Sequence, residues 1–167
     1  MNIEFKVNYT KKTFFRFYAF MLYGVNVGYL IINLIFPFVG LLVLVSNPNL
    51  YLFSIILILL PIALFYSMML QTYSNFSKNK IYQYPETFTL NNETIKVTSE
   101  INQMVIKVED LNKIFIAKNL VVIAIGRGQG YILTKESVEN KSLEEIKVAI
   151  VKLIPKNKIK FYPSYPF

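Results

Sequence analysis

Residues 17–77 contain no Asp, Glu, Lys or Arg, and this gap in charge constrains the fold more than any other feature of the chain. A helix needs about 20 apolar residues to cross about 30 Å of hydrocarbon, so a stretch of this length can cross a bilayer twice. A Ser-Asn-Pro-Asn segment at 46–49 divides it, and Pro48 suits a turn because proline has no backbone N–H to leave unpaired. The sequence therefore predicts a transmembrane helical hairpin with spans at about 20–45 and 50–70.

The composition is typical of a membrane protein and excludes several kinds of catalytic and metal-binding site. Charged residues make up only 17% of the chain, whereas about a quarter is usual in soluble domains. The chain contains no histidine and no cysteine, which excludes disulfides, thiol catalysis, Cys/His zinc sites and imidazole acid-base chemistry. We therefore expect no enzyme activity, no catalytic residues, and no cofactor or metal.

Two starts for the first span are compatible with the sequence. The helix begins either near Tyr23, after an interfacial aromatic stretch, or near Phe14 with a bend at Pro37, because a proline inside a helix removes one backbone bond. Membrane helices tolerate proline when neighbouring groups satisfy the freed carbonyls. Neither Pro37 nor Pro61 in the second span therefore argues against crossing.

Basic residues lie on both flanks of the uncharged stretch and are absent from its central turn. By the positive-inside rule this places both termini in the cytoplasm, and predicts a multi-pass protein of the bacterial cytoplasmic membrane. Each such charge near anionic lipid contributes about 1 kcal/mol to surface binding, so we expect contact with lipid headgroups. The six residues are Lys6, Lys11, Lys12, Arg16, Lys78 and Lys80.

Asn26 and Asn33 lie on nearly the same face of the first predicted span, since their separation is close to two helical turns. Amides in hydrocarbon favour hydrogen bonds between helices. We expect both residues to form helix–helix contacts, either within the hairpin or in a homo-oligomer. A pore is the alternative, but it lacks a charged residue inside the span.

Residues 83–155 have the composition of a soluble domain and predict antiparallel strands followed by one helix. The turn 91–94, with two asparagines that tolerate positive φ, predicts a hairpin. The apolar run 120–125 is typical of a strand buried on both faces. The expected strands are 87–90, 95–98, 104–108, 113–117, 120–125 and 131–134, and the alternation over residues 3–9 predicts another strand, in the N-terminal segment 1–16.

The last predicted element is a helix with a capping box formed by Ser142 and Glu145, followed by a stop at Pro155. After it, the tail 156–167 mixes lysines with Phe and Tyr. We expect this tail either to lack fixed structure or to lie on the bilayer surface with its aromatic rings in the interface.

These elements together resemble the YcxB-like family of small bacterial membrane proteins. The motifs that carry the resemblance are Phe5–Thr10 leading into Phe14–Phe17, then Glu109–Ile114, and Tyr131–Val138. The family usually has a tryptophan before the acidic pair and a proline before the lysine, where this chain has Val108 and Thr134, so it would be a divergent member. The resemblance implies a pleckstrin-homology-like barrel closed by a C-terminal helix, and implies no activity.

A glycine-rich segment at 126–130 is the main candidate for a ligand loop, because glycines let backbone amides converge on an anion. Arg127, together with Lys135 further along, could then contact the ligand. The alternative is a flexible hairpin turn, which we favour because no Lys-Ser/Thr and no helix follow, as nucleotide-binding motifs require. The acid pairs 109–110 and 144–145 lie in a loop and in a first helical turn, where acid-base work is not expected.

The expected fold is thus an α+β membrane protein, with a two-helix hairpin, a small β barrel and one C-terminal helix. We expect a non-enzymatic binding or regulatory protein whose cytoplasmic domain binds a protein, peptide or lipid beside the membrane, with immunity or self-protection as one such role. An accessory subunit of a membrane transporter or channel is the alternative. Nucleic acid is not an expected partner, because residues 83–167 carry 12 basic against 9 acidic residues.

Overall fold

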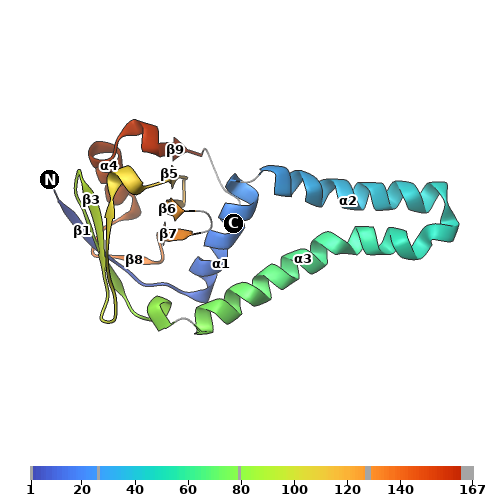
Figure 1. Cartoon of the computed structure of the whole chain (residues 1–167), viewed down its shortest axis with the longest axis horizontal. Coiled ribbons are helices and arrows are strands. Elements are labelled where there is room, and N and C mark those ends of the chain that lie inside the picture. The colour runs from blue at the N-terminus through green and yellow to red at the C-terminus, as the bar shows by residue number, and fades with distance from the viewer. Residues whose placement is uncertain (1, 26, 79, 127–128, 163–167) are drawn as a thin grey trace.

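The computed structural model describes residues 2–25, 27–78, 80–126 and 129–162. An α+β domain lies at one end of the molecule, and two long helices, α2 and α3, extend from it side by side (Figure 1). The short helix α1 lies between this domain and the helix pair (Figure 1).

The helical part begins earlier than either predicted start. Thr10 caps α1, and its hydroxyl accepts a hydrogen bond of 3.1 Å from the Thr13 amide. A π-helical stretch then separates α1 from α2, and such stretches re-aim a helix without proline. The segments are α1 (Lys11–Ala19), η1 (Phe20–Val25), α2 (Val27–Ser46), η2 (Pro48–Leu50), α3 (Tyr51–Lys78) and η3 (Lys80–Gln83).

One helix in the described part of the chain is long and apolar enough to cross a membrane. It runs through Pro48–Lys78, and only 6% of its most apolar window is buried. Ile31–Ser46 is a shorter apolar helix with most of its large side chains exposed. Length and composition thus support one crossing, and the predicted second crossing stays a prediction.

Helices α2 and α3 approach each other closely at Gly40. A Cβ atom added there would lie 2.9 Å from both Ile58 Cγ1 and the Ser54 carbonyl oxygen, and 3.1 Å from Leu57 Cβ. Ser54 is fully buried, and its hydroxyl donates to the Leu50 carbonyl at 3.1 Å. Small residues of this kind allow helix backbones to pack tightly in membranes.

Two open sheets form the folded domain. The first is antiparallel, in the order β4-β3-β2-β1-β8, and the second has the order β7-β6-β5-β9, in which β5 and β9 are parallel. Every predicted strand is present to within two residues. The strands are β1 (Ile3–Val7), β2 (Glu86–Leu90), β3 (Thr94–Thr98), β4 (Gln103–Lys107), β5 (Lys113–Ile116), β6 (Leu120–Gly126), β7 (Gln129–Thr134), β8 (Val138–Glu139) and β9 (Ile159–Phe161).

The predicted barrel is not found among the described strands. Closure would need the edge strands of the two sheets to pair, but among the described strands neither β4 nor β8 pairs with β7 or β9. The strand β9 comes from the tail. The tail therefore has a fixed structure over residues 156–162, contrary to one of the two expectations for it. Lys158 holds it in place by donating to the carbonyls of Glu109 and Leu111 at 2.7 and 2.6 Å. Residues 163–167 lie outside the described part of the chain.

Strand β6 is buried on both faces, as its sequence predicts. Val121 and Ile123 belong to the main core, which both sheets and α4 (Leu143–Leu153) share. Val122 and its neighbours on the other face pack against Phe17 and Phe20, which belong to α1 and η1. The second sheet is thus covered on its outer face by the helix that leads into α2.

The capping box of α4 is confirmed, with reciprocal hydrogen bonds of 3.2 Å between Ser142 and Glu145. The β2–β3 turn forms differently from the prediction. The Asn91 side-chain oxygen accepts from the amides of Glu93 and Thr94, at 2.9 and 2.6 Å, and so closes the turn without positive φ. Asn140, with φ of 67°, is the one non-glycine residue with positive φ in the described ranges.

The packing at Gly40 predicts a specific sensitivity. Gly40→Val should weaken the α2–α3 contact, because its side chain meets backbone that cannot move aside cheaply, and overpacking costs about 1–3 kcal/mol. We expect the apparent Tm of the detergent-solubilised protein to fall by roughly 3–10 °C. Gly28→Val adds the same side chain at an exposed position of α2 and is the matched control. Equal Tm values for the two variants would contradict the contact.

Candidate functional site

A cavity of about 350 Å³ lies where α1 and η3 meet the ends of the two sheets. We call it the aromatic cavity. Five rings and one acid line it, namely Phe14, Phe17, Tyr18, Tyr82, Tyr131 and Glu86. Its volume is near the lower end of the range of about 300–1,000 Å³ that is usual for small-molecule sites.

The rings converge because of their spacing on the chain. Phe14, Phe17 and Tyr18 follow the i, i+3, i+4 spacing that places side chains on one face of a helix, here α1. Tyr82, after α3, contributes from η3, and its ring centroid lies 4.4 Å from that of Phe14. Tyr131 of β7 forms the opposite wall and packs edge-on against Phe88, at 5.1 Å.

Glu86 is directed inward by strand alternation. It is the first residue of β2, whose residues Glu86, Phe88 and Leu90 share the inner face of the sheet. Glu86 is only 2% exposed. Its place in the register, opposite Val7 of β1, fixes it between the main core and the aromatic cavity.

The carboxyl group of Glu86 is incompletely satisfied. Burial raises its pKa to about 7, and the nearby Tyr9 hydroxyl offsets part of this rise. The Tyr9 hydroxyl is the polar neighbour of the carboxyl group, but the contact falls outside strict hydrogen-bond geometry, and neither Glu86 Oε2 nor the Tyr9 hydroxyl has another partner among the described residues. Burial, followed by the charge of Glu86, raises the pKa of Tyr9.

The aromatic cavity thus combines aromatic walls with polar groups, which include Asn102 and Gln129 besides Glu86. In its described lining, Glu86 is the one Asp or Glu, and there is no Lys or Arg. No three His, Cys, Asp or Glu side chains gather as a metal site would need in the ranges that the structure describes. The arrangement can accept a proton near neutral pH, or it can balance the charge of a bound cation.

The predicted membrane-surface residues lie outside this cavity, as far as they are described. Lys11 and Lys12 are exposed at the start of α1, Lys6 lies on β1, and Lys78 is exposed at the end of α3. The side chain of Lys80, at the start of η3, is outside the described part of the structure.

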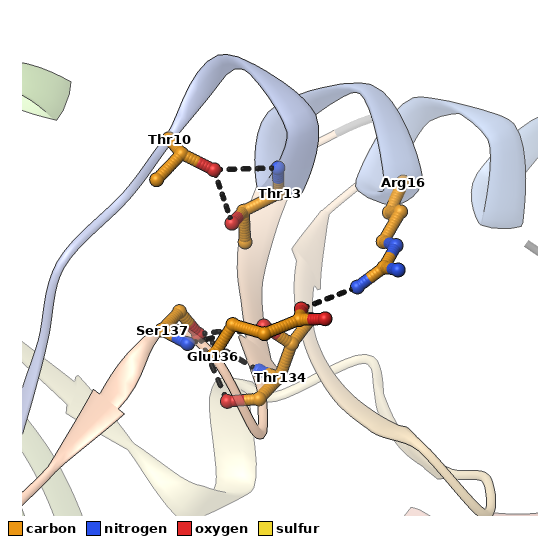
Figure 2. A network of polar contacts seen from close by, with 6 residues as sticks. All are labelled: Thr10, Thr13, Arg16, Thr134, Glu136 and Ser137. Atoms are coloured by element: carbon orange, nitrogen blue, oxygen red, sulfur yellow. Dashed lines mark hydrogen bonds and ion pairs between the residues drawn. The ribbon is translucent and has the colours of Figure 1, made fainter.

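Arg16 has a structural partner. Its guanidinium group donates to Glu136 Oε2 at 2.5 Å, with side chains 22% and 61% exposed (Figure 2). Glu136 belongs to a tight turn in which the Thr134 amide donates to Ser137 Oγ at 2.8 Å, and the Ser137 amide donates to Thr134 Oγ1 at 3.2 Å. An ion pair so exposed contributes little stability, but it shows that the last turn of α1 lies beside the turn that follows β7.

The remaining predicted residues are not brought together as a site. Arg127 and Asn26 lie outside the described residues. Lys135 follows the end of β7, whereas Gln129 and Gly130 of the glycine-rich segment begin that strand. Asn33 is half-buried on α2. Glu144, from one of the acid pairs, forms an ion pair with Lys147 at 2.7 Å.

Neither Glu86 nor the cavity was predicted from the sequence. Two features of the sequence point to them. One is an acid that alternates with the apolar residues of a buried strand face, and the other is a set of aromatic residues at helical spacing just before the first span. Neither feature shows that the segments before α2 and after α3 would meet, because that meeting depends on the tertiary packing of α1.

Comparison with protein-family models, curated proteins and solved structures finds no match for this chain. The resemblance to the YcxB-like family therefore stays a prediction that rests on its motifs.

The raised pKa of Glu86 predicts how stability depends on pH. In the folded protein Glu86 keeps its proton up to about pH 7, whereas in the unfolded chain the same carboxyl group loses its proton near pH 4.5. The free energy of unfolding therefore falls as the pH rises from 4.5 to 7. Glu86→Gln cannot lose a proton. We expect its apparent Tm to match that of the parent at pH 5 and to exceed it at pH 8, by an effect on the order of 1–3 kcal/mol.

The measurement is thermal unfolding in one detergent across pH 4.5–8. Glu93→Gln, at an exposed position, is the control and should keep the pH dependence of the parent. A Glu86→Gln variant with the same pH dependence as the parent would show that Glu86 does not titrate in this window.

Proposed function

We propose that this chain is a membrane-anchored, non-enzymatic binding protein of the bacterial cytoplasmic membrane. In this proposal α2 and α3 cross the bilayer as a hairpin, both termini are cytoplasmic, and the folded domain binds its partner beside the membrane. The observation that carries the proposal is the apolar surface of α3. This helix is long enough to span a bilayer, and only 6% of its most apolar window is buried.

The exposure of α2 supports the second crossing. Soluble monomers rarely expose apolar patches larger than a few hundred Å², whereas both helices carry exposed large side chains along their length, such as Leu34 and Phe38 on α2 and Ile56 and Ile62 on α3. Their mutual contact at Gly40 leaves these outward faces free. Lipid is the surrounding that suits such faces on both helices.

The positions of the basic residues support the orientation. Lys11, Lys12 and Lys78 are exposed where the helix pair joins the folded domain, and the far turn, with Asn47, carries no charge. Headgroups of anionic lipids would then contact these lysines. The domain-side end of the hairpin is accordingly the cytoplasmic side in this proposal.

A binding role is favoured over catalysis because the described cavity offers one acid and no nucleophile–base pair. The motif resemblance supports placing the chain as a divergent YcxB-like protein. Immunity or self-protection is one role that such a protein, held at the membrane surface, could serve.

Membrane insertion can be tested with single-cysteine variants, since the chain has no cysteine of its own. We expect the protein to remain in the membrane pellet at alkaline pH and to be released by detergent. In intact cells whose outer barrier is permeabilised, Asn47→Cys should react with a membrane-impermeant thiol reagent, and Glu93→Cys should react only after lysis. Release by alkali, or protection of Asn47→Cys until lysis, would overturn the proposal.

A further inference from the structure

The aromatic cavity has the chemistry of a binding site for an organic cation. Rings attract cations through the negative face of their π system, and cages of such rings bind quaternary ammonium groups. Here five rings line a space together with Met104 and Ile125, and its described lining holds one acid and no Lys or Arg. We propose that the aromatic cavity binds an alkylammonium group, with the carboxylate of Glu86 balancing its charge.

The unpartnered oxygen of Glu86 is the observation that points to a ligand. A buried carboxylate normally has several hydrogen-bond or ion partners, yet Oε2 has only the poorly aligned Tyr9 hydroxyl beside it among the described residues, although Glu86 lines the cavity. The neighbouring tyrosines supply dipoles and no positive charge. When Glu86 is ionised, a ligand cation would balance its charge, and an anionic ligand would meet repulsion from the same group.

The size of the cavity restricts the ligand. A space of about 350 Å³ with aromatic walls accommodates a small cation such as choline or ethanolamine together with the first atoms attached to it. It does not accommodate a folded peptide segment. The site therefore recognises the ammonium group and only a short part of the molecule that carries it.

The source of the ammonium group is either a phospholipid headgroup or a free amine. The cavity walls include Phe17 and Tyr18, just before η1 and α2, and Tyr82, just after α3. If these helices span the bilayer, as proposed above, the cavity lies at headgroup level. The lipid source rests on that proposed function, whereas ammonium binding itself rests on the cavity alone.

The first test titrates choline and ethanolamine into the full chain in a non-ionic detergent at pH 8, by calorimetry and by tyrosine fluorescence. The neutral isostere of choline, 3,3-dimethyl-1-butanol, is the matched ligand control. We expect choline or ethanolamine to bind, the isostere to bind at least about tenfold more weakly, and Glu86→Gln to lose about tenfold or more in affinity. Glu93→Gln should bind as the parent does.

A second variant keeps the test independent of Glu86. Tyr82→Leu should lose affinity several-fold, and Tyr82→Phe, which keeps the ring, should retain it. The affinity for choline should also be higher at pH 8 than at pH 6, because Glu86 loses its proton over this range. The groups that interact with it, Tyr9, Tyr82 and Tyr131, have pKa values raised by burial and stay neutral there.

Nanodiscs distinguish the two sources. If the ligand is a headgroup, free choline should bind more weakly in phosphatidylethanolamine nanodiscs, where the lipid occupies the site, than in phosphatidylglycerol nanodiscs. Equal affinity in both identifies a free amine. No binding of either cation up to about 10 mM in detergent, or equal binding of the neutral isostere, would overturn the inference. The titration in detergent does not need a bilayer. A negative result there would overturn ammonium binding without bearing on whether the helices cross the membrane.

Discussion

The architecture depends on the double burial of β6. One face of this strand belongs to the main core, and the other face packs against Phe17 and Phe20. Removing apolar surface from water on both sides makes this strand the point at which the folded domain and the helical part are joined. Since α1 continues through η1 into α2, the same contact sets the direction in which the hairpin leaves the domain.

The aromatic residues within 11–25 therefore have two structural roles. One set of rings covers the second sheet, and a neighbouring set lines the cavity beside η3. The Thr10 cap fixes where this helix begins, and the buried rings of Phe17 and Phe20 hold it against β6. The cavity is consequently a product of the junction, and neither the hairpin nor the sheets would form it alone.

Local patterns in the sequence predicted the elements well, because those patterns are settled by neighbouring residues. The alternation in β1, the run in β6 and the Ser142–Glu145 capping box each carry their own signal. What depends on distant segments was not predicted. The tail became β9 because Lys158 and the free edge of β5 hold it there, and the ring of Tyr82 meets Phe14 only after the hairpin returns.

The wrong expectation of a closed barrel and the missed site have the same cause. The sheets stay open because their edge strands, β4 and β8 in one and β7 and β9 in the other, do not pair between sheets in the described part of the chain. Of these edges, β4 and β7 both line the aromatic cavity. The Tyr131 hydroxyl reaches Met104 across the space between these edges, with an O–S distance of 3.6 Å. Free edges require cover, and α1 supplies it on the β7 side while leaving a space lined by its rings. Pairing of β4 with β7 would have closed this space, so the open edges are what leave room for the aromatic cavity beside Glu86.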